Sequence, residues 1–175
     1  DDEITWSDFS DDQWEGPFSS IPGTSNDPTV LMSHLALALD GTIWFGGNGI
    51  TRFSYDETFG SVSLEEDYSA KTASFIDGLI TGNVSDLEVD GNGDLWVATR
   101  EGINRVRWGT DEPEIDAFFD LGNYFANSLY TSLYSPNVIT SLPGGVYNRL
   151  AVSQDGQRMA VTSSLGAVAW DITAR

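Results

Sequence analysis

Residues 77–107 read DGLITGNVSDLEVDGNGDLWVATREGINRVR, and the pattern of this segment predicts the fold class. It holds three short apolar runs, at 84–89, 95–99 and 103–106, each too short for an amphipathic helix. The runs are rich in Val, Ile and Trp, and the segments between them carry the Gly, Asn and Asp that tight turns require. Strand, turn, strand, turn, strand predicts an antiparallel meander whose middle strand is buried on both faces.

The same pattern occurs twice more, over residues 35–53 and 149–172. Trp44 stands in the first copy where Trp96 stands in the second, and we expect Met159 to take that place in the third. Self-similarity at a period of about 50 residues is typical of propeller blades, each of which is a four-stranded sheet. The sequence therefore predicts an all-β chain of antiparallel propeller blades.

Three four-stranded units are expected within a single propeller segment that spans residues 1–175, at about 4–55, 61–108 and 115–172. Each unit should begin with an outer strand, followed by a connection and three inner strands. In the third connection, apolar residues at helical spacing predict one short helix over 123–134. The inner strands should bury six apolar side chains: Trp44, Trp96, Val97, Leu37, Leu87 and Val161.

The composition excludes several classes of partner. With 27 acidic and 8 basic residues, the chain has a formal net charge of -19, which repels nucleic acid and anionic lipid. No apolar run is long enough to span a bilayer, so we expect no membrane insertion. The acidity favours a soluble extracellular surface, and adaptation to high salt is the alternative interpretation.

Three motifs of the second unit stand out: Asp77-Gly-Leu79, Asp90-Gly-Asn-Gly-Asp-Leu-Trp-Val-Ala-Thr99 and Gly102-Ile-Asn-Arg105. Together they resemble the two-component regulator propeller repeat. The resemblance extends to residues 35–53, whereas residues 149–172 look as much like a tryptophan-aspartate or lactonase-type blade. The resemblance implies a propeller fold and an extracellular or periplasmic setting, since propellers of this family are usually sensor or ligand-binding modules.

The sequence offers weak signals for catalytic or metal chemistry. Asp90, Asn92 and Asp94 have the spacing of calcium-loop ligands, but Leu95 stands where that loop needs glycine. His34 is the only histidine and there is no cysteine, so a zinc site is not expected. We therefore predict no catalytic residue, no metal and no cofactor, and interpret His34 as a polar residue at the mouth of a strand.

Aromatic residues in the connections are the candidates for contact with a partner. Trp14, Tyr124, Tyr130 and Tyr134 all lie outside the expected strands. The leading hypothesis is a non-enzymatic, extracytoplasmic module for protein binding or assembly. A propeller that senses an oligosaccharide is the first alternative, and an enzyme similar to streptogramin lyases or lactonases is the second.

Three units also raise the question of what completes the ring. Known propellers have about four to eight blades, and each blade packs against two neighbours. Three units alone would leave two blade faces open to water. We expect further blades from a longer chain or from a protein partner to complete the ring, with a six-bladed ring of two copies as the alternative.

Overall fold

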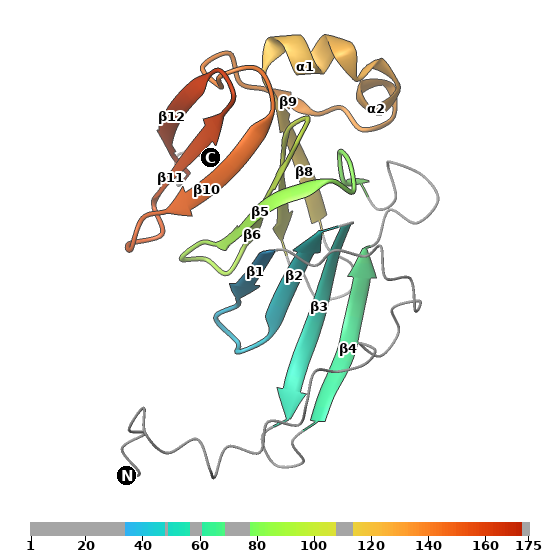
Figure 1. The fold of residues 1–175 in the computed structure, drawn as a ribbon, viewed down its shortest axis with the longest axis vertical. Helices are drawn as coiled ribbons and strands as arrows, with labels where there is room; N and C mark the ends of the chain where they lie inside the picture. The colour runs from blue at the N-terminus through green and yellow to red at the C-terminus, as the bar shows by residue number, and fades with distance from the viewer. Residues whose placement is uncertain (1–33, 48, 57–60, 69–77, 108–113, 173–175) are drawn as a thin grey trace.

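The computed structural model describes residues 34–47, 49–56, 61–68, 78–107 and 114–172. Three β-sheets follow one another in chain order, and the second sheet lies between the first and the third (Figure 1). Such a stack of small antiparallel sheets confirms the predicted propeller-blade architecture. The strand expected at 4–9 lies outside the described residues.

The first sheet contains β1 (His34–Leu37), β2 (Ile43–Gly47), β3 (Gly49–Asp56) and β4 (Ser61–Tyr68). The second contains β5 (Val84–Val89), β6 (Leu95–Thr99), β7 (Ile103–Arg107), β8 (Glu114–Phe119) and the short β9 (Asn137–Val138). The third contains β10 (Tyr147–Val152), β11 (Arg158–Ser163) and β12 (Gly166–Asp171). Within each sheet, neighbouring strands pair antiparallel, except that β9 runs parallel to β8.

The outer strands pair differently from the expectation. β4 is hydrogen-bonded to β3 and β8 to β7, so each outer strand belongs to the sheet that precedes it in the chain instead of beginning the next one. The reason is proximity along the chain, because a strand that follows its neighbour through a short connection pairs with it most easily. The long connections therefore lie between sheets.

The third connection forms two helices, α1 (Leu121–Ala126) and α2 (Ser128–Leu133), where one was predicted over 123–134. The Asp120 side chain caps α1 by accepting hydrogen bonds from the backbone N–H groups of Gly122 and Asn123. Asn127, with φ -101° and ψ 48°, separates the two helices. No helix among the described residues has the length and hydropathy needed to cross a membrane.

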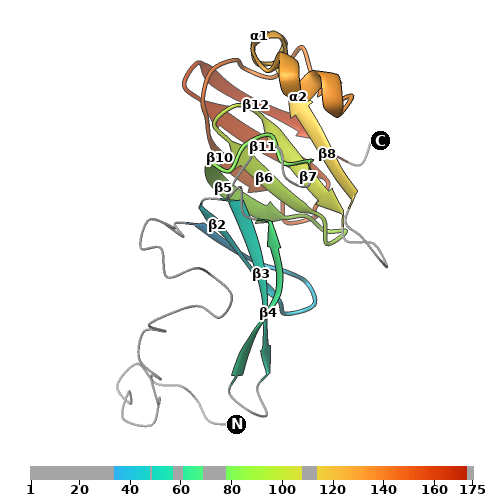
Figure 2. The ribbon, with the colours of Figure 1, turned by 90° about the vertical axis from the view of Figure 1, so that its right-hand side faces the viewer.

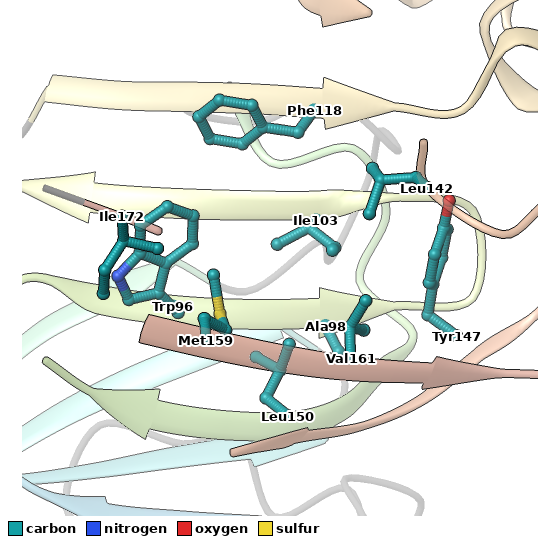
Figure 3. Packing of buried hydrophobic residues seen from close by; sticks show 10 residues of the cluster. All are labelled: Trp96, Ala98, Ile103, Phe118, Leu142, Tyr147, Leu150, Met159, Val161 and Ile172. Carbon is teal, nitrogen blue, oxygen red and sulfur yellow. The ribbon is translucent and has the colours of Figure 1, made fainter. Parts of the chain in front are cut away.

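Most of the hydrophobic core lies at two junctions between sheets, and a smaller third cluster joins Phe119 of β8 to Tyr130 of α2. Junction one, between the first and second sheets, buries Trp44, Leu87 and Val97. Junction two, between the second and third sheets, buries Trp96 and Val161, and Figure 3 shows their packing. These five predicted core residues are confirmed, each at 4% exposure or less.

Leu37 was predicted to be buried, and this was wrong because its side chain is 66% exposed. Ala36, the neighbouring residue on β1, faces junction one instead. β1 alternates leucine with alanine, so both of its faces are apolar and the pattern cannot tell which face meets the next sheet.

The expected equivalence of Met159 with Trp96 was also wrong. Met159 packs in the same cluster as Trp96, on the facing sheet. The residue at the tryptophan position is Ala160, which pairs with Ala169 as Trp96 pairs with Arg105. The third sheet thus has an alanine where the first two have tryptophan.

Candidate functional site

Each innermost strand carries one polar side chain at the same level of the sheet. These residues are His34 on β1, Asp86 on β5 and Arg149 on β10, which we call the inner-strand cluster. His34 Nδ1 and an Arg149 guanidinium nitrogen each lie 3.7 Å from Asp86 Oδ1. Three sheets therefore bring three side chains of different chemistry to one point.

The strand register shows that the three positions are equivalent. The three residues pair with the middle strands of their sheets: His34 with Gly46, Asp86 with Ala98 and Arg149 with Thr162. Each of these partners lies two residues after the tryptophan position of its strand, which is Trp44, Trp96 or Ala160. A repeated architecture places equivalent positions at the same distance from the line on which its sheets converge. The cluster is thus a property of the repeat, and each sheet contributes a different residue to it.

Two β-bulges help to aim the cluster. The pairing of β5 with β6 shifts between Val84 and Asp86, and that of β10 with β11 shifts between Tyr147 and Arg149. Each shift leaves one extra residue just before a cluster residue. Bulges bend a strand and turn the following side chains, and they often lie next to binding sites.

Asp86 is the most constrained member of the cluster. Its side chain is 13% exposed, and it accepts hydrogen bonds from the backbone N–H groups of Leu87 at 3.1 Å and Leu150 at 2.9 Å. The second bond joins the second sheet to the third. Ser85 adds a further link, since its hydroxyl donates to the carbonyl of Tyr147 at 2.9 Å. Asp86 therefore serves junction two as well as the cluster.

Glu88 follows Asp86 on the same strand. Burial raises the pKa of the Glu88 carboxyl above its ordinary value, and the negative charge of Asp86 raises it further.

The exposed member of the cluster is Arg149, whose side chain is 70% exposed against 19% for His34. A ligand that approaches the cluster meets this guanidinium first, which suits carboxylates, phosphates or hydroxyl-rich molecules. Asp86 already accepts two backbone hydrogen bonds, so part of the acceptor capacity of its carboxylate is used within the protein. Among the described residues, no group of three His, Cys, Asp or Glu is placed to hold a metal ion.

A second feature is a hollow of about 260 Å³ at one end of junction one. Its walls include Leu39, Asp40, Trp44, Arg52 and Asn92. Asp40 accepts a hydrogen bond from the Thr42 hydroxyl at 2.6 Å, which is the main reason that the pKa of its carboxyl is lowered. Its other oxygen pairs with Arg52 at 2.6 Å. The polar groups of this wall are thus largely satisfied by one another.

The residues with calcium-loop spacing form a turn. Asp90 Oδ1 accepts hydrogen bonds from the backbone N–H groups of Asn92 at 2.8 Å and Asp94 at 3.1 Å. Asp90 Oδ2 accepts one from the Trp96 indole at 2.9 Å. The Asp90 carboxylate therefore organises the turn and fixes the core tryptophan.

The aromatic residues singled out for partner contact lie in different environments. Tyr130 is buried at 1% exposure, and its hydroxyl donates to the carbonyl of Gly78. Tyr134 packs on the Tyr130 ring at 4.8 Å and is 38% exposed, and Tyr124 is half-buried. Trp14 lies outside the described residues. Partner contact at Tyr124 and Tyr134 stays a prediction.

Sequence reasoning missed Asp86 and Arg149, although one signal was present. Val84 and Leu87 are separated by two polar residues, and so are Tyr147 and Leu150. In both pairs the two apolar residues are buried, which strict alternation along a strand does not allow. Spacing of this kind indicates a bulge, and the bulge marks the cluster.

Comparison with known families agrees with this fold. The family described as two component regulator propeller matches residues 78–101, a short segment within the second unit. This match confirms the resemblance found in that unit. A search of curated protein sequences finds no match for this chain.

Solved structures of similar fold come from several kinds of protein. A Bacteroides uniformis protein assigned as a 6-phosphogluconolactonase matches 89% of this chain and 41% of its own, with a TM-score of 0.54 and 12% identity. A protein assigned as a gluconolactonase matches 82% of this chain and 39% of its own, with a TM-score of 0.50 and 14% identity. The extracellular domain of a B. thetaiotaomicron protein assigned as a one-component system matches 91% of this chain and 26% of its own, with a TM-score of 0.50 and 20% identity.

The chain thus spans less than half the length of these structures, and the likeness shows its fold: the sheets are β-propeller blades. The prediction that the chain is not an enzyme was wrong as an inference from this fold, because similar structures include proteins assigned as lactonases. The single histidine was its main support. The structure places that histidine beside a carboxylate from a second sheet.

Proposed function

We propose that the protein is an extracytoplasmic propeller module for protein binding or assembly, and that its first sheet receives a further propeller blade. The observation that carries this proposal is the outward face of β1. Leu35 is 67% exposed and Leu37 66% exposed, on the face turned away from the second sheet.

The repeat indicates what that face is for. By register, Leu35 and Leu37 are equivalent to Leu87 and Val89 of the second sheet, which pack at junction one against the sheet before them. Burying a leucine side chain contributes about 1.5–3 kcal/mol. In the second sheet these two positions pack against the sheet that precedes it. The exposure of the two leucines in the first sheet therefore favours a further sheet that precedes the first one and packs on them.

The extracytoplasmic setting is supported by the family resemblance and by the similar extracellular domain. A second candidate function, binding of an anionic or hydroxyl-rich ligand such as an oligosaccharide, is favoured by the exposed guanidinium of Arg149. Isothermal titration with candidate ligands, comparing wild type with Arg149→Gln, tests it. Equal heats for both proteins would contradict it.

The assembly function is tested by light scattering of wild type and of the Leu35→Ser/Leu37→Ser variant over a range of concentrations. In the isolated chain we expect the open face to cause association that grows with concentration. The double variant should fold with similar stability, since both side chains are exposed, and should associate less. Leu165→Ser is the matched control, because Leu165 is 76% exposed in the turn between β11 and β12. Unchanged association of the double variant would contradict the proposal.

A further inference from the structure

The helical connection exposes an apolar surface that the propeller fold does not require. Leu121 and Phe125 on α1 are 52% and 71% exposed, and Leu129 and Leu133 on α2 are 60% and 61% exposed. The members of each pair are four residues apart, which makes them neighbours on a helix surface. We call these four side chains the helical row.

The exposure of the helical row is not a sign of loosely attached helices. On their inner side, Tyr130 of α2 is buried against Phe119, with ring centroids 5.5 Å apart, and donates to the carbonyl of Gly78. Burial raises the pKa of the Tyr130 phenol, so its hydroxyl stays a donor. Asn123 of α1 donates to the carbonyl of Gly145 at 3.0 Å. The row is held in place on a fixed support.

The distribution of charge limits which kinds of partner can bind the helical row. Residues 121–138 contain no Asp, Glu, Lys or Arg, in a chain whose net charge is -19. A basic partner finds no carboxylate in this segment to pair with, and an anionic membrane repels the chain as a whole. Two copies of an acidic protein can approach most easily where both surfaces are uncharged.

We propose that the helical row is a self-association surface, on which the row of one copy packs against that of a second. A two-fold interface uses the same patch on both subunits, so an uncharged Leu and Phe surface is complementary to itself. The helices lie at the end of the molecule away from the first sheet (Figure 2). The contact is therefore distinct from the blade-receiving face of β1.

The size and chemistry of the row set the properties of this contact. A stable interface buries about 800 Å² on each partner, and four side chains provide only part of that area. The dimer is therefore weak and reversible. Salt should strengthen it, because screening reduces repulsion between two acidic copies. A contact held by opposite charges would weaken instead.

Sedimentation equilibrium at low and high salt tests the proposal, with wild type, Phe125→Gln/Leu129→Gln and the control Leu165→Gln. We expect the double variant to raise the dimer dissociation constant by about tenfold or more. The control should leave it unchanged, and salt should lower it in wild type. Glutamine is a good helix former, so helical circular dichroism should persist.

Association through the β1 face is separated by repeating the measurement in the Leu35→Ser/Leu37→Ser background. A dimer that persists there and is lost on adding Phe125→Gln/Leu129→Gln supports the helical row. Equal association with and without the row substitutions overturns the proposal, as does a dimer that salt weakens. Binding to phosphatidylcholine vesicles that the row substitutions abolish, without a dimer in solution, would also overturn it in favour of a lipid surface.

Discussion

The two junctions between sheets are built alike, but they differ at the end that holds the turn between the first and second strands of each sheet. At junction two the turns touch: a Cβ on Gly91 would lie 3.1 Å from the Cα of Gly156 in the next sheet. At junction one the equivalent of Gly91 is Leu39, and the hollow of about 260 Å³ lies beside it. Junction two, where the position holds Gly91, is closed at this end, whereas junction one, where it holds Leu39, is open.

The turn geometry explains why this position matters. Gly41, Gly93 and Gly156 occupy the same place in the three turns, each with positive φ and each donating to a carbonyl three residues earlier. Gly156 approaches the bare backbone of Gly91, whereas a Cβ on Gly93 would meet the Leu39 side chain at 3.8 Å. A glycine before the turn thus lets adjacent blades approach closely.

The largest expected effect comes from truncating the core of junction two. Trp96 is 2% exposed, stacks on Phe118 at 5.6 Å and donates to Asp90. Trp96→Ala should lower the free energy of unfolding by about 3–5 kcal/mol. Trp44→Ala should cost less, because Trp44 borders the hollow of junction one. Chemical denaturation measures both, and equal losses would contradict the difference drawn between the junctions.

A matched pair of glycine substitutions tests the turn contact. A methyl group at Gly156 would overlap the backbone N and Cα of Gly91, so Gly156→Ala combines overpacking of about 1–3 kcal/mol with the cost of a positive φ. Gly93→Ala should show only the second cost, about 1–2 kcal/mol. Urea unfolding of the two variants should rank Gly156→Ala as the less stable. The reverse order would show that the turns do not touch at junction two.

The smallest expected effect concerns Glu88, which stands where the first sheet has Ala36. Its pKa is raised from an ordinary 4.5, so its stabilising contribution is complete below about pH 4.5 and is lost as pH rises through the raised value. Glu88→Gln should therefore melt higher than wild type at neutral pH, by less than about 3 °C. Below about pH 4.5 the two proteins should have the same melting temperature. A difference in melting temperature that is seen only at acidic pH would contradict a raised pKa for Glu88.

Much of each blade could be predicted from the sequence because the decisive interactions are local. Alternation and turn residues locate the strands of the second unit, and the buried Trp96 follows from its place in the middle strand. The partner of an outer strand could not be predicted, since the residues of β4 do not specify whether it pairs backward or forward. The exposed face of β1 was ambiguous because both faces are apolar.

The inner-strand cluster shows where sequence reasoning stops. His34 was noted, but its neighbours Asp86 and Arg149 lie far along the chain and meet it only when three sheets stack. The helical row was visible as a spacing of four residues, yet that spacing is equally typical of a buried helix face. Only the packing of Tyr130 beneath α2 shows which side of the helix is covered.

Thiol labelling of β1 shows whether its outward face receives a further blade. The chain has no cysteine, so Leu37→Cys and the control Leu165→Cys each introduce a single reporter. Both side chains are largely exposed here, at 66% and 76%. We predict that Leu37→Cys becomes protected from thiol reagents as the protein assembles, while Leu165→Cys keeps reacting at its original rate. Equally fast labelling of both sites in the assembled protein would show that no blade covers this face.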